Sequence, residues 1–75
     1  MNNNLNTKST ASQNVMILQY LQAGNAITAL EALEMFGCMR LPSRIHDLKT
    51  RGINIISKTI RLANGKHVSQ YSIAE

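Results

Sequence analysis

Residues 37–52 read GCMRLPSRIHDLKTRG, and this stretch decides the fold. Two glycines bracket a segment, residues 40–51, in which apolar residues recur at i, i+4 and i+7, the spacing of one helical face. These apolar residues are Leu41, Ile45 and Leu48. Pro42 falls in the first turn, where its missing N–H leaves no hydrogen bond unmade. The stretch therefore predicts a short helix over residues 40–51, closed by the glycine at 52.

The arc opposite the three aliphatic residues is polar and mostly basic. At about 100° per residue, this arc carries four polar side chains. They are Ser43, His46, Asp47 and Thr50, and one flank adds Arg40, Arg44 and Arg51. Asp47 lies three residues after Arg44 and four before Arg51, the spacing of intrahelical ion pairs, so we expect it to orient these arginines.

Two further helices precede this segment. From about Ser12 to Gln22, apolar residues approximate a helical stripe, and Gly24 supplies a C-terminal stop. The expected stripe consists of Val15, Met16, Leu18 and Leu21, widened by Ile17 and Tyr20. Residues 1–11 are rich in Asn, Ser and Thr, which predicts a flexible tail before a domain over residues 12–75.

The middle helix is predicted to start at Thr28, because Thr28 and Glu31 have the spacing of a capping box. It should end near Gly37, where glycine adopts a left-handed conformation at low cost. The side chains expected on its buried face are Leu30, Leu33 and Phe36. Ile27, just before it, can add a strand of one or two residues.

Downstream of residue 52 the apolar pattern becomes alternating and β-branched, which predicts strands. Asn64-Gly65 between two such runs is a strong hairpin signal. If these two residues form the whole loop, the cross-strand pairs are Ile60 with Ser69, Lys58 with Tyr71, and Ile56 with Ile73. The buried hairpin face would then hold Ile56, Ile60, Tyr71 and Ile73.

The positive charge is concentrated in residues 40–66. The chain has a net charge of +4, yet this segment holds seven Lys or Arg residues against one Asp, which gives +6. A basic segment on an otherwise slightly acidic chain is typical of a polyanion site, because binding to phosphates releases condensed counterions. The alternative on charge alone is a soluble basic surface without a partner.

Three helices followed by a hairpin, with the last two helices joined by a glycine-containing turn, is the order of a winged helix-turn-helix domain. The fold class is mainly α with a two-stranded C-terminal wing (α+β). Over roughly residues 15 to 73 the sequence resembles small helix-turn-helix domains of bacteriophages and prophages. The residues that carry this resemblance are Ile27-Thr28, Leu30-Glu31-Ala32-Leu33, Gly37-Cys38, Arg40-Leu41, Arg44-Ile45-His46-Asp47-Leu48, Gly52 and Asn64-Gly65-Lys66.

The resemblance implies a phage or prophage protein that binds double-stranded DNA, and we expect a transcriptional regulator. The residues expected to contact DNA are Arg40, Ser43, Arg44, His46, Asp47, Thr50, Arg51, Lys58, Arg61 and Lys66. On the helix, Arg40 and Arg44 have the planar donors that match phosphates and guanine edges. On the hairpin, the basic residues suit phosphate or minor-groove contact, although lysine also protects edge strands by its charge.

Other classes are weaker or stay open. No catalytic motif is present, so we expect no enzyme activity, no cofactor and no small-molecule substrate. Cys38 is the only cysteine, which excludes an internal disulfide and argues against zinc. The sequence predicts a cytoplasmic, nucleoid-associated protein with no membrane partner. A homodimer, a winged-helix module that binds a protein and an architectural or excision-type factor all stay open, and Met16, Met35 and Met39 are expected in the core or in a dimer seam.

Overall fold

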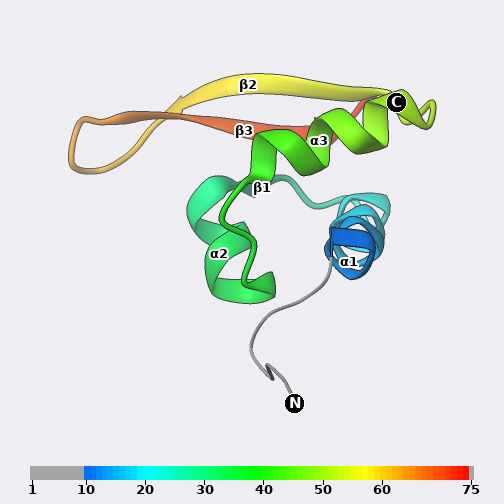
Figure 1. Ribbon diagram of the computed structural model, residues 1–75. Helices are drawn as coiled ribbons and strands as arrows, with labels where there is room; N and C mark the ends of the chain where they lie inside the picture. The colour runs from blue at the N-terminus through cyan, green and yellow to red at the C-terminus, as the bar shows by residue number, and fades with distance from the viewer. Residues whose placement is uncertain (1–9, 75) are drawn as a thin grey trace, which may run out of the picture.

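The computed structural model of the chain describes residues 10–74 as three helices and a three-stranded sheet (Figure 1). The helices are α1 (Thr10–Gln22), α2 (Ala29–Phe36) and α3 (Leu41–Thr50). The strands are β1 (Ile27–Thr28), β2 (Ile55–Arg61) and β3 (His67–Ile73). The expected fold class is confirmed, as is the short strand at Ile27. Most of the tail expected at residues 1–11 lies outside the described residues, but Thr10 and Ala11 form the start of α1.

The apolar face of α3 lies at the centre of the core. Leu41, Ile45 and Leu48 are 1%, 3% and 0% exposed, which confirms the helical rotation predicted from their spacing. The other buried apolar residues come from every element of the fold except β3. They are Ile17, Leu21, Ile27, Ala32, Cys38 and Ile55. Cys38 therefore packs as a small apolar residue in the turn between α2 and α3.

Both ends of α2 are closed as the sequence predicts. At the N-terminus, the Thr28 N–H donates to Glu31 Oε1 at 2.9 Å, and the Glu31 N–H donates to Thr28 Oγ1 at 3.3 Å. At the C-terminus, Gly37 has φ 65°, a left-handed conformation that side chains disfavour. Its N–H donates to the Leu33 carbonyl at 3.0 Å.

The buried face of α2 differs from the prediction. Ala32 is the buried residue of this helix, whereas Leu30 and Leu33 are exposed, so their assignment to the core was wrong. A small side chain at the contact lets the short α2 approach the core closely, and the leucines then point away from it. Phe36 is partly buried, with its ring 5.8 Å from that of Tyr20 in an edge-to-face contact. Of the three methionines expected in the core or in a dimer seam, Met35 and Met39 are exposed rather than in the core.

The orientation of α1 also differs from the predicted stripe. Ile17 and Leu21 are buried, Met16 is only partly buried and Val15 is exposed, because a run of adjacent apolar residues defines no single face. Two polar residues, Gln13 and Asn14, complete the buried face. Both make hydrogen bonds to the rest of the helix-turn-helix unit, which offsets part of their desolvation, while the buried Asn14 Oδ1 has no partner among residues 10–74.

The hairpin forms, but its register is shifted by one residue from the prediction. Ile55 pairs with Ile73, Ser57 with Tyr71, and Ile60 with Val68. The cause is the loop, in which the Leu62 N–H donates to the Lys66 carbonyl at 2.7 Å and encloses three residues rather than two. Gly65, with φ 87°, takes the left-handed position that such three-residue loops require.

The shifted register turns β2 over relative to β3. Tyr71 and Ile73 of β3 pack against the core as expected, but on β2 the buried residue is Ile55, while Ile56 is exposed. A slip of one residue reverses every side chain of a strand, because side chains alternate between faces. Ile56 and Ile60 were therefore assigned to the wrong face.

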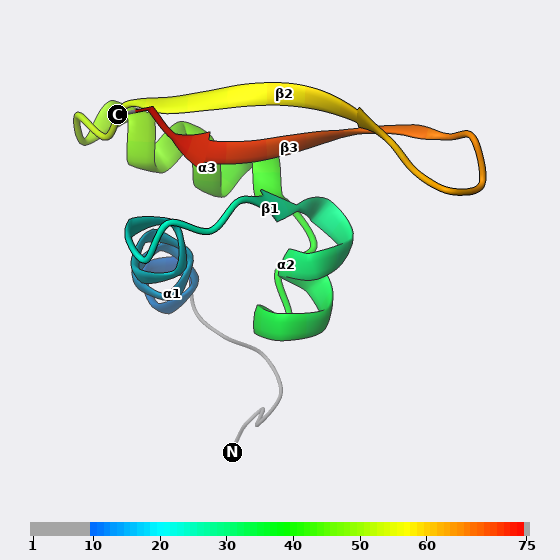
Figure 2. The ribbon, with the colours of Figure 1, turned by 180° about the vertical axis from the view of Figure 1, so that it is seen from behind.

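The three elements of the sheet lie in the order β1-β3-β2, with β3 in the middle. In the view of Figure 1, α3 lies in front of the sheet and α1 and α2 lie below it; in Figure 2, seen from behind, the sheet covers α3. The hairpin of β2 and β3, called the wing below, extends past α2, and its loop lies at the opposite end of the molecule from α1 (Figures 1 and 2).

The burial of the apolar face of α3 predicts that substitutions on this face lower stability more than a substitution at an exposed position. Replacing Ile45 or Leu48 by Ala lowers the free energy of unfolding by about 2 to 5 kcal/mol, because each substitution leaves a cavity where α3 packs against the rest of the core. The matched control is Leu30→Ala on the outer side of α2, which changes the free energy by about 0.5 kcal/mol or less. Urea denaturation of the DNA-free protein, followed by circular dichroism, measures both. Equal losses at the buried and exposed positions would contradict the orientation of α3.

Candidate nucleic-acid interface

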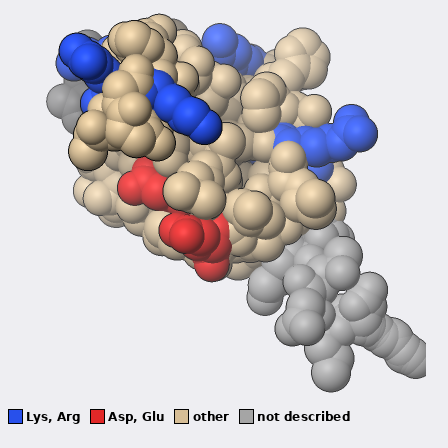
Figure 3. Space-filling model, turned by 90° about the vertical axis from the view of Figure 1, so that its left-hand side faces the viewer, with Lys and Arg blue, Asp and Glu red and all other residues tan. Residues whose placement is uncertain are grey.

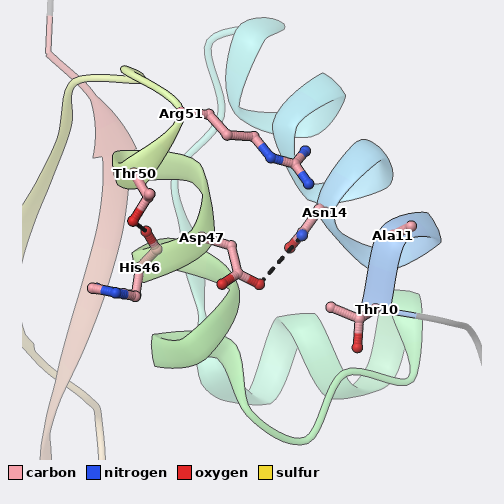
Figure 4. Close-up of a pocket in the computed structure, with 7 residues that line it drawn as sticks. All are labelled: Thr10, Ala11, Asn14, His46, Asp47, Thr50 and Arg51. Carbon is pink, nitrogen blue, oxygen red and sulfur yellow. Dashed lines mark hydrogen bonds between the residues drawn. The ribbon is translucent and has the colours of Figure 1, made fainter.

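The outer face of α3 presents polar side chains in the order that its helical rotation dictates. His46 and Thr50 are exposed, and Ser43 and Asp47 are partly exposed. Thr50 Oγ1 donates to the His46 carbonyl one turn earlier at 2.9 Å, so the hydroxyl proton of Thr50 is already in use (Figure 4). The structure thus brings together the four polar residues that the sequence placed on this arc.

An open hollow of about 590 Å³ lies between this face and the first turns of α1. The residues that line it are Thr10, Ala11, Asn14, His46, Asp47, Thr50 and Arg51 (Figure 4). Arg51 follows the last residue of α3, and its guanidinium extends from there toward α1. The hollow therefore combines the polar face of α3 with the N-terminal part of α1.

Arg44 is tied between the two helices rather than free in solution. Its side chain is 15% exposed, its Nη2 lies 3.2 Å from Asp47 Oδ2, and its Nη1 donates to Thr10 Oγ1 at 3.1 Å. The expected pairing of Asp47 with Arg44 is confirmed, but within residues 10–74 no ion pair joins Asp47 to Arg51. Arg51 points toward α1 instead, so that half of the expectation was wrong.

Asn14 is a component of the site that the sequence analysis missed. It is 2% exposed, and its Nδ2 donates to Asp47 Oδ2 at 3.3 Å (Figure 4). A signal for it exists in the sequence, since Asn14 precedes Ile17 by three residues and Leu21 by seven, and so shares their helical face. Because Asn residues are mostly exposed, and because the sequence does not reveal a partner for Asn14, its polarity favoured a position on the surface.

The remaining predicted residues lie at the two ends of α3 and on the wing. Arg40 is exposed at the N-cap of α3, and the three basic wing residues, Lys58, Arg61 and Lys66, are also exposed. Figure 3 shows the face that carries the end of the wing, with Lys and Arg side chains along its top and right and the acidic side chains in one group below. On this face the basic side chains therefore lie apart from the acidic group.

The polar outer face of α3, the glycine turn before it and the basic wing after it define a DNA-binding domain of the helix-turn-helix class. The chain matches the winged helix-turn-helix domain family over residues 12–75 and belongs to that family. Comparisons with curated proteins and with solved structures give no match in either. Among residues 10–74, no helix has the length and apolar content needed to cross a membrane.

The contrast between Arg44, within α3, and Arg51, just after it, is testable without DNA. Arg44→Ala lowers the free energy of unfolding by about 1 to 3 kcal/mol, because it removes a mostly buried side chain and leaves Asp47 without its charge partner. Arg51→Ala removes the same charge from an exposed position and changes it by about 0.5 kcal/mol or less. Thermal and urea denaturation of both variants at one pH compares them. A larger loss for Arg51→Ala would show that the junction of α1 with α3 is misassigned.

Proposed function

We propose that this protein binds double-stranded DNA in a sequence-specific manner, with α3 in the major groove. The observation that supports this most directly is the polar outer face of α3, which stays accessible while its apolar face is fully buried. A major groove about 12 Å wide admits one helix, and each base pair presents a distinct pattern of donors and acceptors there. The family of the chain supports the same conclusion.

The two basic elements take different roles in this proposal. Arg40, Ser43 and His46 approach base edges from α3, together with Asp47, Thr50 and Arg51. Lys58, Arg61 and Lys66 on the wing contact phosphates or the adjacent minor groove, which adds affinity with little sequence information. Arg44, which is held between Thr10 and Asp47, acts on DNA mainly by positioning Asp47.

The biological role that fits this activity is transcriptional regulation in a phage or prophage, exerted in the bacterial cytoplasm at the nucleoid. The supporting observation is the sequence resemblance described above, together with the family of the fold. DNA binding, and not a chemical reaction, is the activity proposed. An excision-type or architectural role would use the same interface, and a DNA-bending assay on a selected site distinguishes it from a regulator.

Salt dependence tests the DNA-binding proposal directly. The affinity for duplex DNA falls steeply as salt rises, with a slope in log–log form of about 0.9 per phosphate contacted. Lys66→Ala weakens binding to selected and random duplexes alike and reduces the slope by about 1, whereas Arg40→Ala reduces the ratio between the two duplexes. Fluorescence anisotropy at two salt concentrations measures these quantities.

The matched control for this series is Lys49→Ala, which removes the same charge from an exposed position of α3 outside the predicted site. Equal effects of Lys49→Ala and Lys66→Ala would mean that only net charge matters, and would contradict a contact by the wing. Absence of duplex binding by the folded wild type at low salt would contradict the proposal as a whole.

Exposed apolar side chains on α2 and in the turn after it favour a second activity, self-association on DNA. Leu30 and Leu33 of α2 are exposed, and Met39 in the following turn is 85% exposed. A single helix of ten residues reads few base pairs, whereas helix-turn-helix dimers read two half-sites. We propose that a second copy of the chain packs on this surface when two sites lie side by side.

Cooperative binding measures this second activity. Wild type binds a duplex with two adjacent selected sites more tightly than the product of two single-site affinities predicts, and Leu30→Gln removes the excess while leaving single-site affinity unchanged. Glu34→Gln, on the same helix, is the control and retains cooperativity. Additive binding by the wild type at every spacing tested would contradict the proposed contact.

A further inference from the structure

The two carboxylate oxygens of Asp47 have different surroundings. Oδ2 faces inward, where it accepts from Asn14 Nδ2 at 3.3 Å and lies 3.2 Å from Arg44 Nη2. Oδ1 has no hydrogen-bond partner among residues 10–74, and the Asp47 side chain, 34% exposed, lines the open hollow beside His46. Figure 4 shows one oxygen joined to Asn14 and the other directed away from it.

We propose that Asp47 is a specificity-determining residue that selects cytosine, by accepting a hydrogen bond from the exocyclic amino group of one cytosine through Oδ1. This inference rests on the proposed function, since it requires α3 to lie in the major groove. It goes further in that it names one base and the atom that reads it.

The carboxylate is held in place before DNA arrives. Asn14 is 2% exposed and belongs to α1, so it holds Oδ2 from a rigid element other than the one that carries Asp47. Arg44 holds the same oxygen from within α3 and balances its charge. A side chain fixed by two such supports loses little conformational entropy on binding, and its neutralised charge lowers the repulsion from phosphates.

The chemistry of a carboxylate oxygen limits which base it can contact. Ionised carboxylates only accept hydrogen bonds. In the major groove, cytosine offers an amino donor, whereas guanine offers two acceptors and thymine one acceptor. Adenine has an amino donor next to the N7 acceptor, which repels a carboxylate placed between them. Of the four bases, cytosine therefore fits a single fixed acceptor best.

The position of Asp47 in the structure supports a role in recognising a base rather than in contacting a phosphate. Within the described residues, the other acidic side chains, Glu31 and Glu34, belong to α2, so Asp47 is the one acid on the outer face of α3. A carboxylate is poorly suited to phosphate contact, so its presence among basic residues is useful where a base donates to it.

Selection from randomised duplex DNA tests this inference with wild type, Asp47→Asn and the control Glu34→Gln. The wild-type site is expected to contain one cytosine that Asp47→Asn no longer selects, with adenine, the base that suits an amide, favoured there instead. The other positions of the site stay the same. Glu34→Gln removes an equal charge from α2 and selects the wild-type sequence.

A second measurement uses the wild-type protein alone, and so does not depend on the folding of a variant. Changing the selected cytosine to thymine in a synthetic duplex weakens wild-type binding by about tenfold, the order expected for one base contact. The same change leaves binding by Asp47→Asn nearly unaffected. Circular dichroism confirms that the variant compared is folded.

The outcomes separate the two levels of the proposal. If wild type and Asp47→Asn both bind and select the same sequence, or if wild type tolerates all four bases wherever cytosine is found, the assignment of Asp47 is overturned and DNA binding stands. If folded wild type binds no duplex at low salt, the proposed function fails, and this inference fails with it.

Discussion

The rotation of α3 about its own axis is the constraint on which the rest of the structure depends. Three aliphatic side chains at i, i+4 and i+7 enter the core together in one orientation only, and all three are almost fully buried. That burial fixes which residues point outward. The buried aliphatic side chains therefore determine which side chains form the polar outer face of α3. A loss of packing beneath α3 would misplace every group proposed to reach DNA.

The junction of α1 with α3 adds a second, polar constraint. Adjacent residues of α1 reach two different parts of the helix-turn-helix unit, since Gln13 donates to the Gly37 carbonyl at 3.3 Å and Asn14 donates to Asp47 at the same distance. One bond therefore holds the turn before α3, and the other holds its outer face. Because buried amides are costly without partners, α1 is fixed against α3 by hydrogen bonds whose geometry apolar packing alone would leave undefined.

The parts of the fold that the sequence predicts are those that local interactions decide. The capping box at Thr28, the left-handed Gly37 and the apolar period of α3 each involve residues within two turns of one another, and each is confirmed. The errors lie where distant partners decide. Leu30 and Leu33 fit a buried face by hydrophobicity, but the small Ala32 makes the contact, and no local pattern reveals which face a short helix turns inward.

In the candidate site, the sequence likewise predicted the contacts within α3 but not those between α1 and α3. The four polar residues of the α3 arc do share a face, and the pairing of Asp47 with Arg44 follows from their spacing within one helix. Asn14 could not be identified as a partner of Asp47, because 33 residues separate them and only the fold brings them together. The burial of Arg44 has the same origin, since Thr10 and the rest of α1 cover a side chain that a helical projection leaves exposed.

One additional residue in the hairpin loop changes which side chains lie on each face of the wing. With the loop enclosing three residues, Arg61 pairs with His67 and shares a face with Tyr71, while Lys58 pairs with Gln70 on the other face. A two-residue loop would have given a different distribution of charge. Both faces of the wing are open beyond the helices, so its basic residues can reach phosphates from either side of the ribbon (Figure 2). The register of the hairpin thus matters greatly for the core but little for contact with the phosphate backbone of DNA. In contrast, α3 must present its side chains to the bases in one orientation. This difference is a physical reason for assigning sequence reading to α3 and affinity to the wing.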